Sequence, residues 1–127
     1  MKKIISDEID INIETLFVPE RSIIERNRFF FMYTVSIKNF SQQTVQLISR
    51  HWIFENAQGE IFEVKGSGVV GEKPIIKVRE TYSYTSATEI NTPSGFMYGS
   101  YQMIDENAEE FNVKIDKFKL IMPRTLH

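Results

Sequence analysis

The sequence predicts an all-β protein, an antiparallel sandwich or small barrel of about seven strands. Three observations carry this prediction. Apolar and polar residues alternate along most of the apolar segments. These segments are rich in β-branched and aromatic residues, which favour strands. No window longer than a few residues has the 3.6-residue period of an amphipathic helix.

The expected strands follow one another about every 10 residues, with turn-forming residues between them. The first alternates until Leu16, with isoleucines on odd positions and polar residues on even ones. The third is apolar on both sides and is therefore expected at the centre of a sheet. In the last, the apolar positions change from odd to even, which predicts a bulge near Asp116 and Lys117. The strands are expected at residues 9–17, 29–38, 45–54, 61–64, 75–78, 81–85, 95–104 and 111–120.

Three connections stand out between these strands. Residues 55–60 have the composition of a short hairpin loop, in which Gly59 is free to adopt a positive φ. Residues 19–27 form the longest polar connection of the first half, and residues 88–94 its counterpart in the second half. No linker or repeat divides the chain, so residues 1–127 are expected to form one domain.

Composition excludes several classes of function. The chain has no cysteine, which rules out disulfides, zinc–thiolate sites and thiol catalysis. A net charge of -2 and a pI near 5.7 argue against a general binder of nucleic acid or anionic membranes. The longest apolar run has five residues, far short of the roughly 20 of a membrane span, and no signal peptide is apparent. We therefore expect a cytoplasmic protein.

A glycine motif, G-x-G-x-x-G, runs from Gly66 through Gly68 to Gly71. In dinucleotide-binding folds a helix must follow it, but here β-branched residues and Pro74 follow, so that interpretation fails. Two interpretations remain open. Either successive backbone N–H groups form an anion-binding nest, or the glycines only allow a tight excursion between strands.

Charged residues interrupt the third strand at Arg50 and His51. Alternation places Arg50 on the same face as Trp52, with His51 on the opposite face. Arg50 is a candidate cation for a phosphate or a partner carboxylate. Alternatively, Arg50 pairs inside the protein with an acid such as Glu72 or Glu89, and His51 is hydrogen-bonded in or near the core.

Catalytic and metal sites are not expected. The two histidines, His51 and His127, lie far apart in the sequence, and no cofactor is indicated. The acidic stretch at residues 105–110 lacks the glycine of a calcium loop. Ser67 has no identifiable base. The protein is therefore expected not to be an enzyme.

A cluster of aromatic and methionine side chains is the remaining candidate. Such residues are enriched at the centres of protein interfaces, although a core of this size must also bury many of them. The candidate interface residues are Tyr82, Tyr84, Met97, Tyr98 and Tyr101.

Six segments, in order, resemble the ApaG domain family over nearly the whole chain. They include the Arg50-His51-Trp52 stretch and the glycine motif, and they cover residues 28–37, 45–52, 66–74, 84–86, 92–101 and 123–127. The resemblance implies a fibronectin type III-like, and thus immunoglobulin-like, β-sandwich. It also implies a small cytoplasmic bacterial protein when the domain stands alone.

The resemblance further implies a role in protein–protein interaction, since similar eukaryotic domains are attached to F-box proteins and to a polymerase-interacting protein. The family is also labelled with cobalt and magnesium efflux, and without a membrane span that link would be indirect. We therefore expect a non-enzymatic module that binds a protein partner. A sensor of polyphosphates or dinucleoside polyphosphates is the alternative. A homodimer formed through an unpaired edge strand is also considered. The candidate ligand or partner residues are Arg50, His51, Gly66, Gly68, Gly71 and Glu72.

Overall fold

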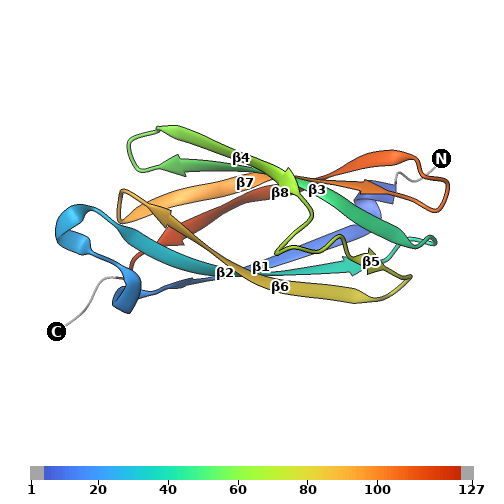
Figure 1. The fold of residues 1–127 in the computed structure, drawn as a ribbon, viewed down its shortest axis with the longest axis horizontal. Coiled ribbons are helices and arrows are strands. Elements are labelled where there is room, and N and C mark those ends of the chain that lie inside the picture. The colour runs from blue at the N-terminus through green and yellow to red at the C-terminus, as the bar shows by residue number, and fades with distance from the viewer. Residues whose placement is uncertain (1–4, 124–127) are drawn as a thin grey trace.

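The computed structural model describes residues 5–123 and shows two antiparallel β-sheets packed face to face (Figure 1). One sheet has the order β1-β2-β6. The other has the order β4-β3-β7-β8, with β5 paired to the start of β3. The strands are β1 (Ile9–Phe17), β2 (Phe29–Asn39), β3 (Val45–Asn56), β4 (Ile61–Ser67), β5 (Ile75–Ile76), β6 (Thr81–Ile90), β7 (Ser94–Ile104) and β8 (Glu110–Ile121). This confirms the predicted all-β sandwich.

Short 3-10 helices are the only helical elements in residues 5–123. The first, η1 (Ile5–Glu8), precedes β1, while η2 (Pro19–Arg21) and η3 (Ile24–Arg26) lie in the connection between β1 and β2. That connection folds back on itself, because Ile23 and Arg28 form an isolated antiparallel bridge. The polar segment predicted at residues 19–27 is therefore a structured corner.

Several strands are longer than expected. β4 extends beyond the predicted residues 61–64 and includes Gly66 and Ser67 of the glycine motif, and β6 runs to Ile90 rather than ending at residue 85. The predicted connection at residues 88–94 shrinks accordingly, because Thr88 and Glu89 continue the pairing of β6 with β2. The two paired residues of β5 are fewer than the run predicted at 75–78. Residues 124–127, which belong to the last segment of the resemblance, and His127 with them, lie outside the described residues.

Two bulges set the direction of the side chains. In β8, Asp116 and Lys117 together oppose Tyr98, because Met97 pairs with Phe118 while Gly99 pairs with Ile115. This is the bulge that the sequence predicts. A second bulge lies in β3 at Ile48, where the pairing with β7 shifts between Leu47 and Ser49. It rotates the rest of β3, so that Leu47 and Trp52 both face the core.

The core lies between the two sheets and is rich in aromatic residues. Trp52 is at its centre, in edge-to-face contact with Tyr33, Tyr101 and Phe118, at ring-centroid distances of 5.6, 6.1 and 5.9 Å. At one end, the buried side chain of Asn39 ties three segments together. Its Nδ2 donates to Gln43 O and Ile76 O, and its Oδ1 accepts from Ser41.

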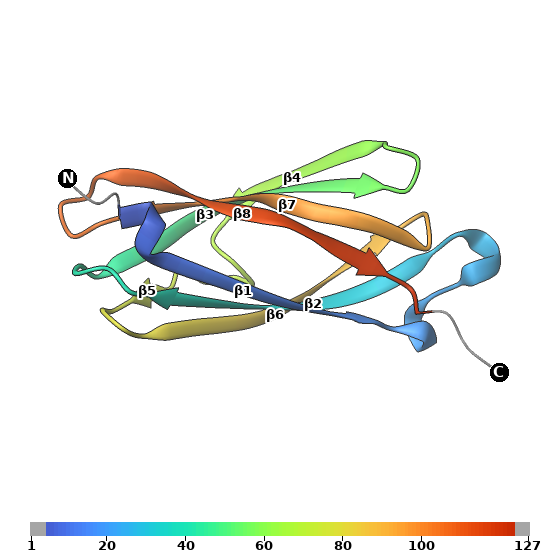
Figure 2. The same ribbon diagram turned by 180° about the vertical axis from the view of Figure 1, so that it is seen from behind.

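The sandwich has two sides on which the edges of the sheets face each other. Figure 1 shows β4 and β6 on one side, with the connection from β4 to β5 passing between the sheets. Figure 2 shows β1 and β8 on the other side. We call these the β4–β6 side and the β1–β8 side. Unpaired edge strands allow association, so the homodimer stays a prediction.

Candidate functional site

Arg50 faces the inside of the sandwich on the β4–β6 side. It shares the inner face of β3 with Trp52, as the sequence predicts from their spacing of two residues, and lies between Gly66 of β4 and Tyr101 of β7. Its Nη1 donates to two carbonyl oxygens of the loop after β4, Ser67 O at 2.9 Å and Gly68 O at 2.8 Å. The guanidinium is thereby fixed in one place.

The alternative in which Arg50 pairs with an acid inside the protein is wrong. Within the described part of the chain, Arg50 forms no salt bridge. Glu89 instead pairs with Arg28 at 3.1 Å, on the outer face of β6. Glu72 accepts a hydrogen bond from the Tyr82 hydroxyl at 3.0 Å. Both acids therefore have other partners, and backbone carbonyls take their place at Arg50.

The glycine motif forms a tight turn around Arg50. A Cβ on Gly66 would lie 2.8 Å from both Nη1 and Nη2 of Arg50, so the guanidinium occupies the space of the missing side chain. Gly68 and Gly71 have φ values of +59° and +81°, which favour glycine. Between them, Val69 and Glu72 exchange backbone hydrogen bonds of 2.8 and 2.9 Å and close a two-residue turn.

This turn uses most of the N–H groups that an anion-binding nest would need. The N–H of Gly68 donates to Ile48 O at 2.7 Å, and those of Val69 and Glu72 donate to each other's carbonyls. The exposed Val70 completes the turn with a φ of +42°, unusual for a β-branched residue. The geometry thus favours the structural interpretation of the glycines over the nest.

A polar cavity of about 210 Å³ lies between Arg50 and β6. Its lining comprises Tyr33, Arg50, Trp52, Ser67, Val69, Val70, Gly71, Tyr84 and Ser86. Trp52 is 2% exposed, and its Nε1 is buried with no hydrogen-bond partner among the described residues. Burial raises the pKa values of Tyr33 and Tyr84, so both phenols are neutral at physiological pH.

Three of the five candidate interface residues are in the core. Tyr84, Met97 and Tyr101 are almost fully buried, and the Tyr84 and Tyr101 hydroxyls form a hydrogen bond with each other. Their strands alternate, and these positions point inward. A role for them in an exposed recognition surface is therefore wrong.

The other two candidates, Tyr82 and Tyr98, are partly exposed. Tyr98 is on the outer face of β7, where Lys117 Nζ lies 4.9 Å from its ring centroid and 5.1 Å from that of Phe96. Tyr82 lies at the inner edge of β6, beside Glu72. The sequence alone does not separate these two from the buried three. Alternation does not reveal which face of β7 is inward, and Tyr82 shares a face of β6 with the buried Tyr84.

His51 lies on the opposite face of β3 from Arg50, as predicted. Its Nε2 is 2.9 Å from Glu63 Oε1, and its side chain is 26% exposed. It borders a hollow of about 480 Å³ on the outer face, whose lining also includes Arg50, Lys65 and Gln102. Both residues border this hollow, but their side chains leave β3 on opposite faces.

An apolar cleft next to the polar cavity was not predicted. It measures about 380 Å³. Its lining comes from β3, β4, β6 and the residue after β6: Phe54, Asn56, Phe62, Val64, Thr88, Glu89, Ile90 and Asn91. Phe62 and Val64 are 52% and 45% exposed although they lie on the inner face of β4. The available signal was the pair of apolar residues two positions apart, which places both on one face of a strand.

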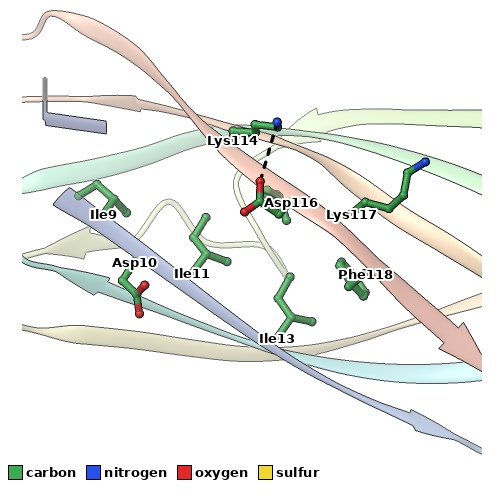
Figure 3. A pocket seen from close by; sticks show the side chains of 9 residues that line it. Ile9, Asp10, Ile11, Ile13, Lys114, Asp116, Lys117 and Phe118 are labelled. Atoms are coloured by element: carbon green, nitrogen blue, oxygen red, sulfur yellow. Dashed lines mark ion pairs between the residues drawn. The ribbon is translucent and has the colours of Figure 1, made fainter. Parts of the chain in front are cut away.

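On the β1–β8 side a groove of about 320 Å³ separates the two edge strands. Figure 3 shows Ile11 and Ile13 of β1 facing β8 across this groove. On the β8 side, Lys114 and Asp116 form an exposed ion pair of 3.9 Å. Charged residues and the bulge make β8 a poor template for pairing with another strand.

A metal-binding cluster does not appear in residues 5–123. No group of three or more His, Cys, Asp or Glu side chains is placed to hold a metal ion in that range. Nor does any described helix have the length and apolarity needed to cross a membrane.

The fold defines the class: a β-sandwich domain of immunoglobulin-like architecture. A model of the ApaG domain family matches residues 19–105. The chain is 47% identical to protein ApaG of Methylocella silvestris over 123 residues, 97% of this chain and 95% of that protein. It is also 47% identical to protein ApaG of Vibrio cholerae over 119 residues, 94% of each chain. The chain therefore belongs to the ApaG family.

Solved structures agree with this assignment. The crystal structure of the putative ApaA protein from Bordetella pertussis has a TM-score of 0.88 at 40% identity, covering 92% of this chain and 95% of that one. The C-terminal domain of Wzt has a TM-score of 0.57 at 8% identity, covering 94% of this chain and 75% of that one. This second likeness concerns the fold alone.

Proposed function

We propose that the protein is a non-enzymatic binding domain that docks a protein partner on its β4–β6 side. The main observation behind this proposal is the apolar cleft. There, Phe62 and Val64 are about half exposed, and both lie on β4, a strand at the edge of its sheet. Exposed apolar residues gathered at one place are typical of interaction sites. An edge strand also offers backbone groups to an extended segment of a partner.

The chemistry of the cleft fits this role better than catalysis. Its lining is mainly apolar and includes the partly buried Phe54, the buried Ile90 and two asparagines. Asn56 Nδ2 already donates to Glu60 and Asn91, which fixes that end of the cleft. Any role in cobalt or magnesium efflux would act through the bound partner, and cytoplasmic location belongs to the same proposal.

The polyphosphate alternative receives less support. The loop donors are largely paired within the protein, and the cavity at Arg50 is smaller than the roughly 300–1,000 Å³ of sites for drug-sized ligands. A dinucleoside polyphosphate exceeds this space. We therefore favour the protein partner.

The test compares affinity capture from a bacterial lysate by three immobilised proteins: wild type, Phe62→Ser and Phe40→Ser. Phe40 is the matched control because its ring is 47% exposed, against 52% for Phe62, and lies outside the cleft. A partner retained by wild type and Phe40→Ser, but at least tenfold less by Phe62→Ser, supports the proposal, since buried aromatic anchors dominate interfaces. A partner retained equally by all three, or none above background in several conditions, counts against it.

A further inference from the structure

We propose that the polar cavity between Arg50 and β6 is a binding site for a carboxylate group. The inference goes beyond the proposed function, because it concerns the cavity itself and its test requires no protein partner. Two unused sets of donors carry it, one on Arg50 and one on Trp52.

The guanidinium of Arg50 is held in place, and only part of its hydrogen-bond donors have partners. Its Nη1 holds the carbonyls of Ser67 and Gly68, and the group lies against the backbone of Gly66. Its Nε and Nη2 have no hydrogen-bond partner among residues 5–123. These two nitrogens form one planar edge of the guanidinium, whose parallel N–H groups match the two oxygens of a carboxylate.

Trp52 supplies the independent observation. An indole Nε1–H is only a donor, and a buried one normally has an acceptor. Trp52 Nε1 is buried without one in the described part of the chain, and Trp52 lines the same cavity as Arg50. The lining contains no aspartate or glutamate, so the protein itself supplies no anion to these donors.

The size of the cavity limits the ligand. About 210 Å³ corresponds to roughly seven water molecules at about 30 Å³ each. A free monocarboxylic acid fits that space, and so does the carboxylate of an acidic side chain. The apolar cleft continues from the cavity along β3, because Phe54 follows Trp52 on the same face. An acidic residue two positions from an aromatic one in an extended peptide would therefore reach both.

The test uses the only tryptophan of the chain as a reporter. Its indole N–H gives a single signal in a ¹H–¹⁵N correlation spectrum of the labelled protein. Sodium acetate replaces sodium chloride at constant ionic strength in one arm, and a blocked Phe-Ala-Asp tripeptide is added in a second. We expect a saturable downfield shift of the indole proton as it gains a charged acceptor.

Substitutions assign the shift to this cavity. Arg50→Lys keeps the charge but loses the planar edge, and we expect at least tenfold weaker binding, equivalent to about 1.4 kcal/mol. Arg21→Lys is the matched control, because Arg21 is exposed and packs over Phe30 away from the cavity, and it should bind as wild type does.

The outcomes separate cleanly. Saturable binding of acetate alone indicates a free acid as ligand, while tighter binding of the tripeptide indicates an acidic segment, and both support the site. An indole signal that stays unchanged in wild type with both probes overturns the proposal, whether or not Arg50→Lys folds. It is also overturned by an equal shift in Arg50→Lys. With inorganic phosphate as a third probe, a shift with phosphate and none with acetate overturns it too. If the affinity capture retains no partner, the interpretation of these spectra does not change.

Discussion

Substitution of Gly68 by alanine should destabilise the fold through the turn beside Arg50. At a φ of +59°, an alanine costs about 1–2 kcal/mol relative to its preferred conformations. Its Cβ would also lie 2.1 Å from Glu72 O, a backbone atom that can move only with the turn. Displacing the turn weakens the two hydrogen bonds between Val69 and Glu72, at about 0.5–1.5 kcal/mol each.

The sum is about 2–5 kcal/mol, or a fall in Tm of about 8–20 °C for a domain of this size. Gly71→Ala is the matched control, because Gly71 has a φ of +81° but nothing within 4 Å of the added Cβ. It should lose about 1–2 kcal/mol, from the backbone conformation alone. Differential scanning calorimetry of both variants measures the difference. Equal losses would refute the steric part of the reasoning.

Three further predictions concern stability. Phe62→Ser should change the free energy of unfolding by no more than about 1 kcal/mol in urea titrations, since the ring is 52% exposed; a larger loss would make it unusable in the capture experiment. Asn39→Ala should cost about 2–4 kcal/mol, because it leaves buried backbone groups unpaired, whereas the exposed Asn12→Ala should be neutral within about 0.5 kcal/mol. Burial raises the pKa of Tyr101 above its unfolded value of 10.0. The contribution of the neutral phenol to the free energy of unfolding is therefore fully present below pH 10, and it decreases as the pH rises above 10. The urea midpoint should therefore fall between about pH 9 and about pH 10.5, and it should fall less in Tyr101→Phe.

The sequence predicts one of the two bulges and misses the other, for a physical reason. In β8 the apolar positions change parity at Asp116, and this leaves a visible mark in an otherwise alternating strand. In β3 the bulge at Ile48 lies in a strand with apolar residues on both faces. A change from odd to even core positions is therefore not visible in the sequence. The fold class and most strand boundaries follow from local alternation. Pairing with neighbouring strands lengthens some of the strands beyond the alternating residues.

The site depends on contacts between distant segments and is less accessible to sequence reasoning. Alternation puts Arg50 and Trp52 on one face, but it does not say that the face is inward or that Ser67 and Gly68 supply the acceptors. An acid was the natural expectation, because arginine pairs most strongly with carboxylates. The cleft beside Phe62 arises only where β4 and β6 approach across the sandwich.

The left-handed conformation of Val70 has a consequence for engineering. Valine and glycine occupy the two central positions of a turn in which both residues have positive φ, where asparagine followed by glycine is preferred. Asparagine at position 70 is thus an obvious route to a more heat-resistant variant. The same residue lines the cavity at Arg50, so this change would also alter the lining of the cavity. Thermal tolerance and ligand access are coupled at a single position, and selection for one would alter the other.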